Sequence, residues 1–315
     1  MPIEVPRGAE QIRKPSWIKA KAPGSPEYLE TKGLVTSLKL HTVCEEARCP
    51  NIGECWSHHT ATFMIMGDLC TRKCHFCAVK KGTSETLVAL DPFEPERVGL
   101  AVKQLRLKHA VITSVDRDDV SDNGAGHFSR TVAAIRMHAP ECKIELLIPD
   151  LKGSQKDLET IVKSGIDVLN HNVETVPRLY KKVRPGAGFI RSLSILRWAK
   201  EFDPRIMTKS GIMVGLGEEK EEVFDLMDSL RESNVDIMTI GQYLRPSEKQ
   251  LPVKAFVTPE EFKEYEEEGL KRGFKFVESG PLVRSSYHAW KHTSETPMHE
   301  QETARTSSIL AQRAE

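Results

Sequence analysis

The sequence predicts an α/β fold in which strands and helices alternate to form a partial (β/α)6 barrel. Strand-type apolar runs lie at 61–66, 109–115, 143–148, 167–172, 210–214 and 236–240. Stretches with apolar residues at i, i+3 and i+4 lie between most of these runs, at 95–107, 127–138, 155–163, 189–201 and 219–231. This alternation indicates parallel strands joined by right-handed crossovers, although a doubly wound open sheet would show the same spacing.

The chain before the predicted barrel forms an N-terminal extension. Its first 40 residues are rich in Pro, Lys and Gly and show weak periodicity, which predicts an extended arm. One short helix is expected over 28–32, and we expect Trp17 and Ile18 to anchor the arm to the core.

The chain after the predicted barrel begins with a strong helix start. Thr258 can cap the helix, Pro259 suits its first turn, and Glu261 can complete a capping box. Gly273 is expected to end this helix, and a last strand follows it. The polar end of the chain predicts disorder. The predicted divisions are an N-terminal extension 1–60, the barrel 61–257, a C-terminal extension 258–292 and a disordered tail 293–315.

Charge and hydropathy exclude several classes of protein. Lys+Arg and Asp+Glu both number 45, so there is no electrostatic case for binding nucleic acid or an anionic membrane. No apolar run approaches the roughly 18 residues that a membrane span needs. Residues 1–24 lack the apolar stretch of a secretory signal, and Glu4 and Glu10 interrupt any resemblance to a transit peptide. We therefore expect a cytoplasmic protein.

Cysteine is the most informative residue type. Six of the seven cysteines fall in one short window: Cys44, Cys49, Cys55, Cys70, Cys74 and Cys77. Disulfides are the plain alternative, but they are rare in cytosolic chains, where cysteines packed this closely are more often metal ligands. Cys142 stands alone before a predicted strand and is expected to be a small core residue.

The second group of cysteines has the spacing C-x3-C-x2-C and follows the first predicted strand, where the functional loops of a barrel emerge. Cys70, Cys74 and Cys77 can hold three irons of a cubane cluster and leave the fourth iron open. A ferredoxin-like carrier would need four cysteines per cluster, and a structural zinc would need four closed ligands. His75 inside the motif keeps a Cys3His zinc site open as an alternative.

The segment C-T-R-K-C-H-F-C, which includes Phe76, resembles the signature of the radical S-adenosylmethionine (SAM) superfamily. In that superfamily the amino and carboxylate groups of SAM chelate the open iron of a 4Fe–4S cluster. One electron from the cluster then cleaves the sulfonium and yields a 5′-deoxyadenosyl radical. The resemblance implies a partial barrel of the radical SAM type, with SAM as cosubstrate.

The first group of cysteines has the spacing C-x4-C-x5-C, and two triads in this order resemble the lipoyl synthase family specifically. The resemblance covers roughly residues 13 to 289. It includes R-K-P-S-W-I-K near the start, V-I-T-S-V-D-R-D-D at 111–119, N-H-N-V-E-T-V at 170–176, V-R-P at 183–185, K-S-G-I-M-V-G-L-G-E at 209–218 and V-R-S-S-Y-H-A at 283–289.

This resemblance implies a second, auxiliary 4Fe–4S cluster on Cys44, Cys49 and Cys55, with a serine of the R-S-S-Y motif as fourth ligand. By position in the motif this serine is Ser286, with Ser285 as the alternative. An oxygen ligand matches iron–sulfur chemistry less well than thiolate, which suits a cluster that comes apart. Without the cysteines, two serines here would indicate only a solvated turn.

The resemblance also implies residues that contact SAM. They are Phe76 in the cluster motif, Thr113 and Ser114 near the amino group, Asn172 and Glu174 near the ribose, Arg184 near the carboxylate, and Gly215 in a glycine-rich segment. A plain surface salt bridge remains the alternative for Arg184. The charged loop 116–119 could order the pocket or dock the substrate protein, or could be solvated.

The reaction implied is insertion of two sulfur atoms, at the sixth and eighth carbons of an octanoyl group on a carrier lysine. The carriers are acyltransferase subunits of 2-oxoacid dehydrogenases and the glycine-cleavage H protein. Sulfur would come from the auxiliary cluster, with a reducing electron donor and an iron–sulfur cluster carrier as further partners. The alternatives are another radical SAM sulfur-inserting or methylthiolating enzyme, and a non-catalytic iron–sulfur electron carrier.

Overall fold

The computed structural model describes residues 13–20, 22–47, 49–57 and 61–294. In this part of the chain the main sheet has the order β1-β2-β5-β6-β7-β8-β9-β10. Its strands are β1 (His41–Thr42), β2 (Thr62–Ile65), β5 (His109–Ser114), β6 (Lys143–Leu147), β7 (Val168–Asn170), β8 (Met207–Val214), β9 (Ile237–Gln242) and β10 (Phe276–Gly280). Only β1 is antiparallel to its neighbour, and the other neighbouring pairs are parallel.

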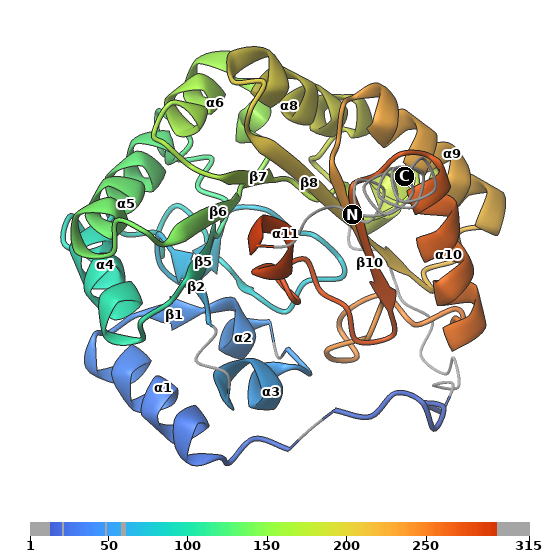
Figure 1. Ribbon diagram of the computed structural model, residues 1–315, viewed down its shortest axis with the longest axis horizontal. Helices are drawn as coiled ribbons and strands as arrows, with labels where there is room; N and C mark the ends of the chain where they lie inside the picture. The colour runs from blue at the N-terminus through green and yellow to red at the C-terminus, as the bar shows by residue number, and fades with distance from the viewer. Residues whose placement is uncertain (1–12, 21, 48, 58–60, 295–315) are drawn as a thin grey trace, which may run out of the picture.

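Helices form a ring around the outside of this sheet (Figure 1). They are α4 (Glu94–Gln104), α5 (Ala125–His138), α6 (Gln155–Val162), α8 (Phe189–Phe202), α9 (Lys220–Glu232) and α10 (Pro259–Lys271). A doubly wound sheet would carry helices on both faces, so the one-sided ring decides for the barrel. None of the described helices is long and apolar enough to cross a membrane.

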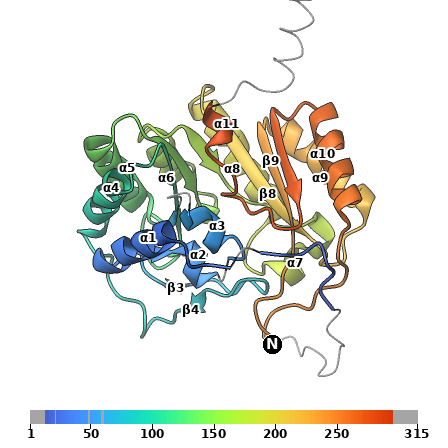
Figure 2. The ribbon, with the colours of Figure 1, turned by 60° about the horizontal axis from the view of Figure 1, so that its bottom comes forward.

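The barrel is partial, because β1 and β10 are the two ends of the sheet and do not pair in the described part of the chain. Three helices of the N-terminal extension cover this open side: α1 (Pro26–Ser37), α2 (Val43–Glu46) and α3 (Ile52–Ser57) (Figure 2). Helix α1 is longer than the expected 28–32, because Ser25 accepts a hydrogen bond from the Tyr28 amide and Pro26 suits the first turn.

The N-terminal arm is anchored by a different tryptophan from the one expected. Trp17 is 41% exposed, so the prediction that it anchors the arm in the core is wrong. Trp56 in α3 is fully buried instead, and its ring stacks on Tyr28 with 5.1 Å between centroids. Trp17 lies before α1, in a described segment that has no helix or strand.

The C-terminal extension begins as the sequence predicts. Thr258 and Glu261 form the expected capping box at the start of α10, and Gly273, with φ of +87°, follows its end. After β10 the chain passes along the open side of the barrel, where the side chain of Asn51 donates a hydrogen bond of 2.7 Å to the Leu282 carbonyl.

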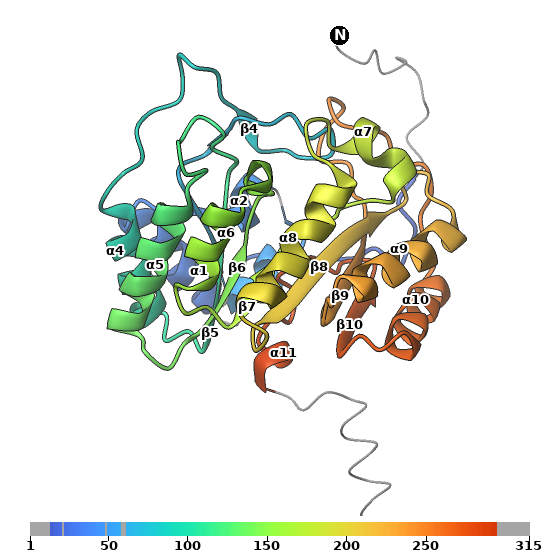
Figure 3. The same ribbon diagram turned by 90° about the horizontal axis from the view of Figure 1, so that it is seen from above.

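The short helix α11 (Lys291–Ser294) lies within the ring of strands, at the end opposite β4 (Lys80–Lys81) and α7 (Tyr180–Val183) (Figures 1 and 3). Disorder predicted from residue 293 is therefore wrong for the start of the tail. His292 is 3% exposed and packs on Phe276, and the Thr293 hydroxyl lies 3.0 Å from Nδ1 of His109. Residues 295–315 lie outside the described part of the chain.

Candidate cluster and cofactor site

A cavity of about 500 Å³ opens at the carboxyl ends of the parallel strands. Cys70, Cys74 and Cys77 all line it, so the structure brings the second cysteine triad to one place. Both extensions reach the same cavity, through Lys14, Val43, Ala47 and Pro50 on one side and Val283, Arg284 and Ser285 on the other. The cavity therefore lies between the triad-bearing loop of the barrel and the two segments that close its open side.

The loop that carries the second triad is held by backbone hydrogen bonds at both ends. The carbonyl of Cys70 accepts from Gly82 at 2.9 Å, and the carbonyl of Cys77 accepts from the Gln250 side chain at 3.1 Å. The backbone of His75 is held on both sides, because its amide donates to the Val183 carbonyl and its carbonyl accepts from the Leu251 amide. Its ring nitrogen Nδ1 lies 2.7 Å from the Lys182 carbonyl, so the ring is engaged away from the thiols.

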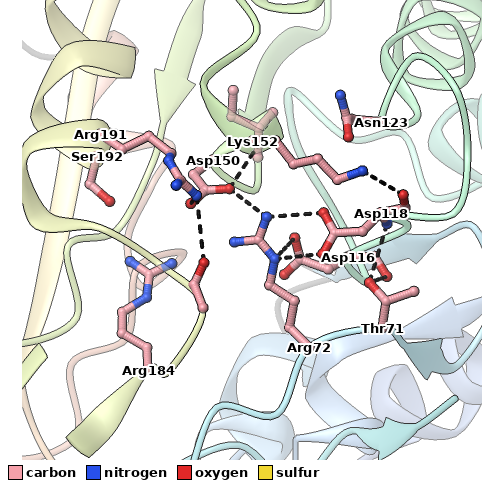
Figure 4. A network of polar contacts seen from close by, with 12 residues as sticks. Thr71, Arg72, Asp116, Asp118, Asn123, Asp150, Lys152, Arg184, Arg191 and Ser192 are labelled. Atoms are coloured by element: carbon pink, nitrogen blue, oxygen red, sulfur yellow. Dashed lines mark hydrogen bonds and ion pairs between the residues drawn. The ribbon is translucent and has the colours of Figure 1, made fainter. Parts of the chain in front are cut away.

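Arg72, within the same loop, is the centre of a buried ion-pair network (Figure 4). Its guanidinium reaches Asp118 after β5 at 2.8 Å and Asp150 after β6 at 2.7 Å, with Asp116 at 3.4 Å. Arg191 from α8 contacts the other oxygen of Asp150 at 3.1 Å. The network therefore ties the cluster loop to the segments that follow β5 and β6 and, through Asp150, to α8.

The pKa values of the carboxyls in this network depend on two opposing effects. Burial raises them, and the neighbouring arginines lower them. Burial raises the pKa of Asp150, but Arg72 outweighs it and brings the pKa down to about 2. Burial raises the pKa of Asp116 to about 6, because Arg72 only partly offsets it and Asp118 and Asp150 add to it. Asp116 also lines the cavity beside the second triad.

The rest of the charged loop 116–119 also orders the site. Arg117 is buried and pairs with Asp119 at 2.7 Å, and it donates to the Val88 carbonyl at 2.8 Å. The loop is therefore tied to the chain around it, which favours the first of the three roles considered for it, the ordering of the pocket.

The first triad lies in the N-terminal extension, with Cys44 on α2, Cys49 after it and Cys55 on α3. Burial raises the pKa of Cys44 to about 12, and the neighbouring Cys49 adds to this rise. Burial likewise raises the pKa of Cys55 to about 12, with further increases from Cys44 and Cys49. The three thiols therefore lie near one another, and a cation that binds them must displace their protons.

The R-S-S-Y segment follows Leu282, whose carbonyl accepts the hydrogen bond from Asn51, so it lies near the segment that carries the first triad. Burial raises the pKa of Cys49, and Arg284 acts in the opposite direction, so the guanidinium is close to that thiol. Burial raises the pKa of Tyr287, and Glu54 and Cys55 raise it further. The two residues that flank the serine pair are thus near different cysteines. Ser285 lines the cavity, whereas Ser286 is not among its lining residues.

Of the residues expected to contact SAM, Phe76, Thr113, Ser114, Asn172, Glu174 and Arg184 all line the cavity. Three buried atoms there have no hydrogen-bond partner among the described residues: Oγ of Ser114, Oδ1 of Asn172 and Nε of Arg184. Arg184 is 8% exposed and donates a hydrogen bond of 2.6 Å to the Asn172 carbonyl. The alternative of a surface salt bridge is therefore wrong. Burial raises the pKa of Glu174, although Arg184 opposes it.

Gly215 is not among the residues that line the cavity. It lies at a turn with φ of +97°, and its amide donates to the Glu218 carboxylate. Gly211, four residues earlier in the same segment, lines the cavity instead, and a Cβ there would meet the side chains of Thr239 and Asn172. The glycine-rich segment drew attention to the region, but its motif did not distinguish these two glycines.

The donor sets fit the implied cofactors. Three thiols that open on one cavity match a cluster with an open iron, and unsatisfied polar atoms beside them match a polar ligand. Within the described ranges, no three His, Cys, Asp or Glu side chains converge closely enough to hold a single metal ion. Cys142 is 3% exposed and belongs to the core, as predicted.

Comparison with known proteins agrees with this geometry. Residues 64–230 match the model of the radical SAM superfamily, and residues 3–49 match that of the N-terminal domain of lipoyl synthase. Methylornithine synthase (PylB) shares the fold with a TM-score of 0.52 over 71% of this chain and 72% of that one, at 17% identity. SuiB of Streptococcus suis shares it with a TM-score of 0.54 over 73% and 52%, at 13% identity. The partial barrel and its cysteine loop thus define a radical SAM enzyme.

Two curated relatives make the assignment narrower. The lipoyl synthase of Rubrobacter xylanophilus is 56% identical over 90% of this chain and 87% of its own length. That of Roseiflexus sp. is 52% identical over 91% of this chain and 94% of its own length. The chain belongs to the lipoyl synthase family. This confirms the predicted family, fold class and enzyme class, a radical SAM sulfurtransferase, together with the two 4Fe–4S clusters and SAM that the family implies.

Proposed function

We propose that this protein inserts two sulfur atoms, at the sixth and eighth carbons of an octanoyl group, on a lysine of a lipoyl carrier domain. The observation that carries the proposal is the single cavity that the second triad shares with both closing segments. Such a cavity lets one bound substrate meet SAM on one side and a sulfur source on the other. We further propose that the auxiliary cluster on Cys44, Cys49 and Cys55 is that sulfur source.

The lining of the cavity suits an octanoyl chain. Apolar side chains from several strands and loops face it: Met64, Val115, Leu147, Ile148, Ile212 and Met213. The C–H bonds to be replaced are unactivated, so acid–base chemistry cannot break them. A cluster held by Cys70, Cys74 and Cys77 would supply the electron that cleaves SAM, and the resulting radical could break these C–H bonds. The apolar part of the lining would also help to keep water away from that radical.

The polar side chains of the cavity would hold SAM. Arg184 presents an unsatisfied Nε and suits the SAM carboxylate, because a guanidinium binds carboxylates with short charged hydrogen bonds. Ser114 and Asn172 offer free oxygens to the amino group and the ribose hydroxyls. Thr113 already donates to the Leu147 carbonyl at 2.9 Å, so its part is to fix the end of β5.

We propose Ser286 as the fourth ligand of the auxiliary cluster, with Ser285 as the alternative. The positions of Arg284 and Tyr287 beside the first triad support a ligand from this segment. The cavity lining favours Ser285 of the two, because Ser285 is among the lining residues and Ser286 is not. The motif position favours Ser286, so the two serines need to be compared in parallel variants.

The finer partners follow from the chemistry. We propose that the carriers are acyltransferase subunits of 2-oxoacid dehydrogenases and the glycine-cleavage H protein, in the cytoplasm, where thiols stay reduced. Each turnover would need electrons from a reducing donor. A consumed auxiliary cluster would also need an iron–sulfur cluster carrier to rebuild it.

Variants of one cysteine from each triad test this proposal. Cys74→Ala should abolish cleavage of SAM to 5′-deoxyadenosine under dithionite, because it removes a ligand of the cluster that binds SAM. Cys49→Ala should still cleave SAM but form no lipoyl product. Cys142→Ala is the matched control, a buried cysteine outside both triads, and should do both. Normal lipoyl formation by Cys49→Ala would overturn the assignment of the sulfur source.

A further inference from the structure

A second, larger hollow of about 1230 Å³ lies on the outer side of the cluster loop. Thr71, Cys74 and Cys77 line it together with residues that follow β6, β7 and β9. Cys74 and Cys77 also line the cavity of about 500 Å³ described above, which we call the inner cavity. The cluster loop therefore borders both spaces. We call this hollow the outer groove.

The outer groove is strongly basic. Seven of its lining side chains are Lys or Arg, and Asp118 is its one carboxylate, which Arg72 already pairs. Lys73, Lys81, Lys181 and Lys249 make no ion pair with any residue in the described part of the chain. The whole chain has a formal net charge of +0, so this concentration is local.

The outer groove and the inner cavity are lined by different segments of the chain, apart from the cluster loop that they share. The inner cavity is lined by the N-terminal extension, at Val43 and Pro50, and by the C-terminal segment, at Val283 and Ser285. None of these residues lines the outer groove. A protein seated in the groove would therefore contact the cluster loop without covering these residues of the two closing segments, and would leave them to the octanoyl carrier.

We propose that the outer groove is the docking site of an acidic, one-electron carrier protein that reduces the SAM-binding cluster. This inference rests on the proposed function and adds the partner that supplies its electrons. One electron leaves the reduced cofactor of the carrier and enters the cluster, and the carrier is released in its one-electron-oxidised state. Unpaired lysines around Cys74 and Cys77 attract an acidic surface and would bring its cofactor to the loop that holds the cluster.

The test uses the reconstituted holoenzyme and an acidic flavodoxin as the probe. Lys181→Glu/Lys249→Glu reverses two exposed, unpaired charges at the groove, and neither residue lines the inner cavity. The matched control is Lys103→Glu/Lys108→Glu, two exposed lysines beside the opposite ends of the strands. Calorimetry should give a dissociation constant for oxidised flavodoxin raised about tenfold or more in the groove variant and little changed in the control.

Activity separates this proposal from the proposed function. With dithionite as reductant, the groove variant should cleave SAM and form lipoyl product at the wild-type rate. With reduced flavodoxin, its rate should fall about tenfold, and added salt should slow the wild type in the same way. Flavodoxin binding unchanged by the reversal would refute the docking site. A raised KM for octanoyl H protein under dithionite would also overturn it, because the groove would then serve the carrier.

Discussion

Lys209 and Glu145 form an ion pair in the interior of the barrel, and its removal tests how the strands are held. Both side chains are fully buried, and Nζ of Lys209 lies 3.1 Å from Oε1 of Glu145. Asn170 donates a further hydrogen bond of 2.8 Å to this carboxylate, and Nε2 of His109 lies 3.5 Å from its other oxygen. The pair therefore joins β6 to β8 across β7 at the end of the barrel that α11 closes.

Lys209→Met should destabilise the protein by about 3–4 kcal/mol at pH 7. Removing one partner of a buried ion pair generally costs about 3–5 kcal/mol, because the other charge stays buried without compensation. The carboxyl of Glu145 can escape this by taking up a proton. An ordinary glutamate pKa is about 4.3, so protonation at pH 7 costs about 4 kcal/mol at 1.36 kcal/mol per pH unit, which limits the loss.

The pH dependence has a defined sign. In the wild type, burial raises the pKa of Glu145, but Lys209 and His109 outweigh it and bring the pKa down to about 2. Its contribution to stability is therefore fully present above the ordinary glutamate pKa and is lost as the pH falls toward 2. In Lys209→Met the pKa should rise above the ordinary value. The penalty should then grow as the pH rises from about 4.3 toward 7.

Thermal unfolding of the anaerobically reconstituted protein, followed by circular dichroism, measures the effect. At about 2–4 °C per kcal/mol, Lys209→Met should lower Tm by about 10 °C at pH 7, and less at pH 5. The double variant Lys209→Met/Glu145→Gln should recover part of the loss, because no charge remains buried. Lys103→Met, at an exposed lysine, is the control. A loss in Lys209→Met no larger than in this control would refute the reasoning.

Three further predictions follow from the site. Reconstituted protein should hold about eight irons, the number for two cubanes, and a count near four with the cysteines intact would rule out two clusters. Ser286→Ala should lower lipoyl formation while SAM cleavage persists, because it removes the proposed serine ligand. If only Ser285→Ala has this effect, the ligand is Ser285 and the assignment of Ser286 is wrong. Arg72→Met should lower Tm and weaken binding of the SAM-binding cluster, because Asp150 loses its main partner. Arg72→Lys should restore only part of the Tm, because lysine keeps the positive charge but lacks the paired donors of arginine. A wild-type Tm in Arg72→Met would count against the network.

Hydrophobic periodicity predicted the alternation of strands and helices, whereas the choice of a barrel over a doubly wound sheet rested on the resemblance to the radical SAM superfamily. The predicted strand 109–115 is β5, and the predicted helix 127–138 agrees with α5 to within two residues at its start. The strand is a continuous apolar run that is buried at all but its last residue, and the helix has apolar residues at helical spacing, so both patterns are local and can be detected in the sequence. Helix α11 has no such pattern, because it has a single turn and is held by His292 and Thr293 inside the barrel.

The candidate site was predictable where a motif carried it. The cysteine spacing brought both triads into view, since thiols are too rare to cluster without a reason. Asp150 and Lys209 were missed, because an aspartate after a strand and a lysine within one look like ordinary polar residues. Their role depends on partners 78 and 64 positions away, at Arg72 and Glu145, and only the folded chain reveals such pairs.

Sulfur insertion by this protein can be measured in a single incubation. Anaerobically reconstituted protein is mixed with SAM, dithionite and an octanoyl-lysine peptide, and the peptide is measured by mass spectrometry. We expect a peptide that has gained two sulfur atoms, with two molecules of 5′-deoxyadenosine formed for each lipoyl group. Formation of 5′-deoxyadenosine with no sulfur in the peptide, from protein that holds both clusters, would contradict this expectation.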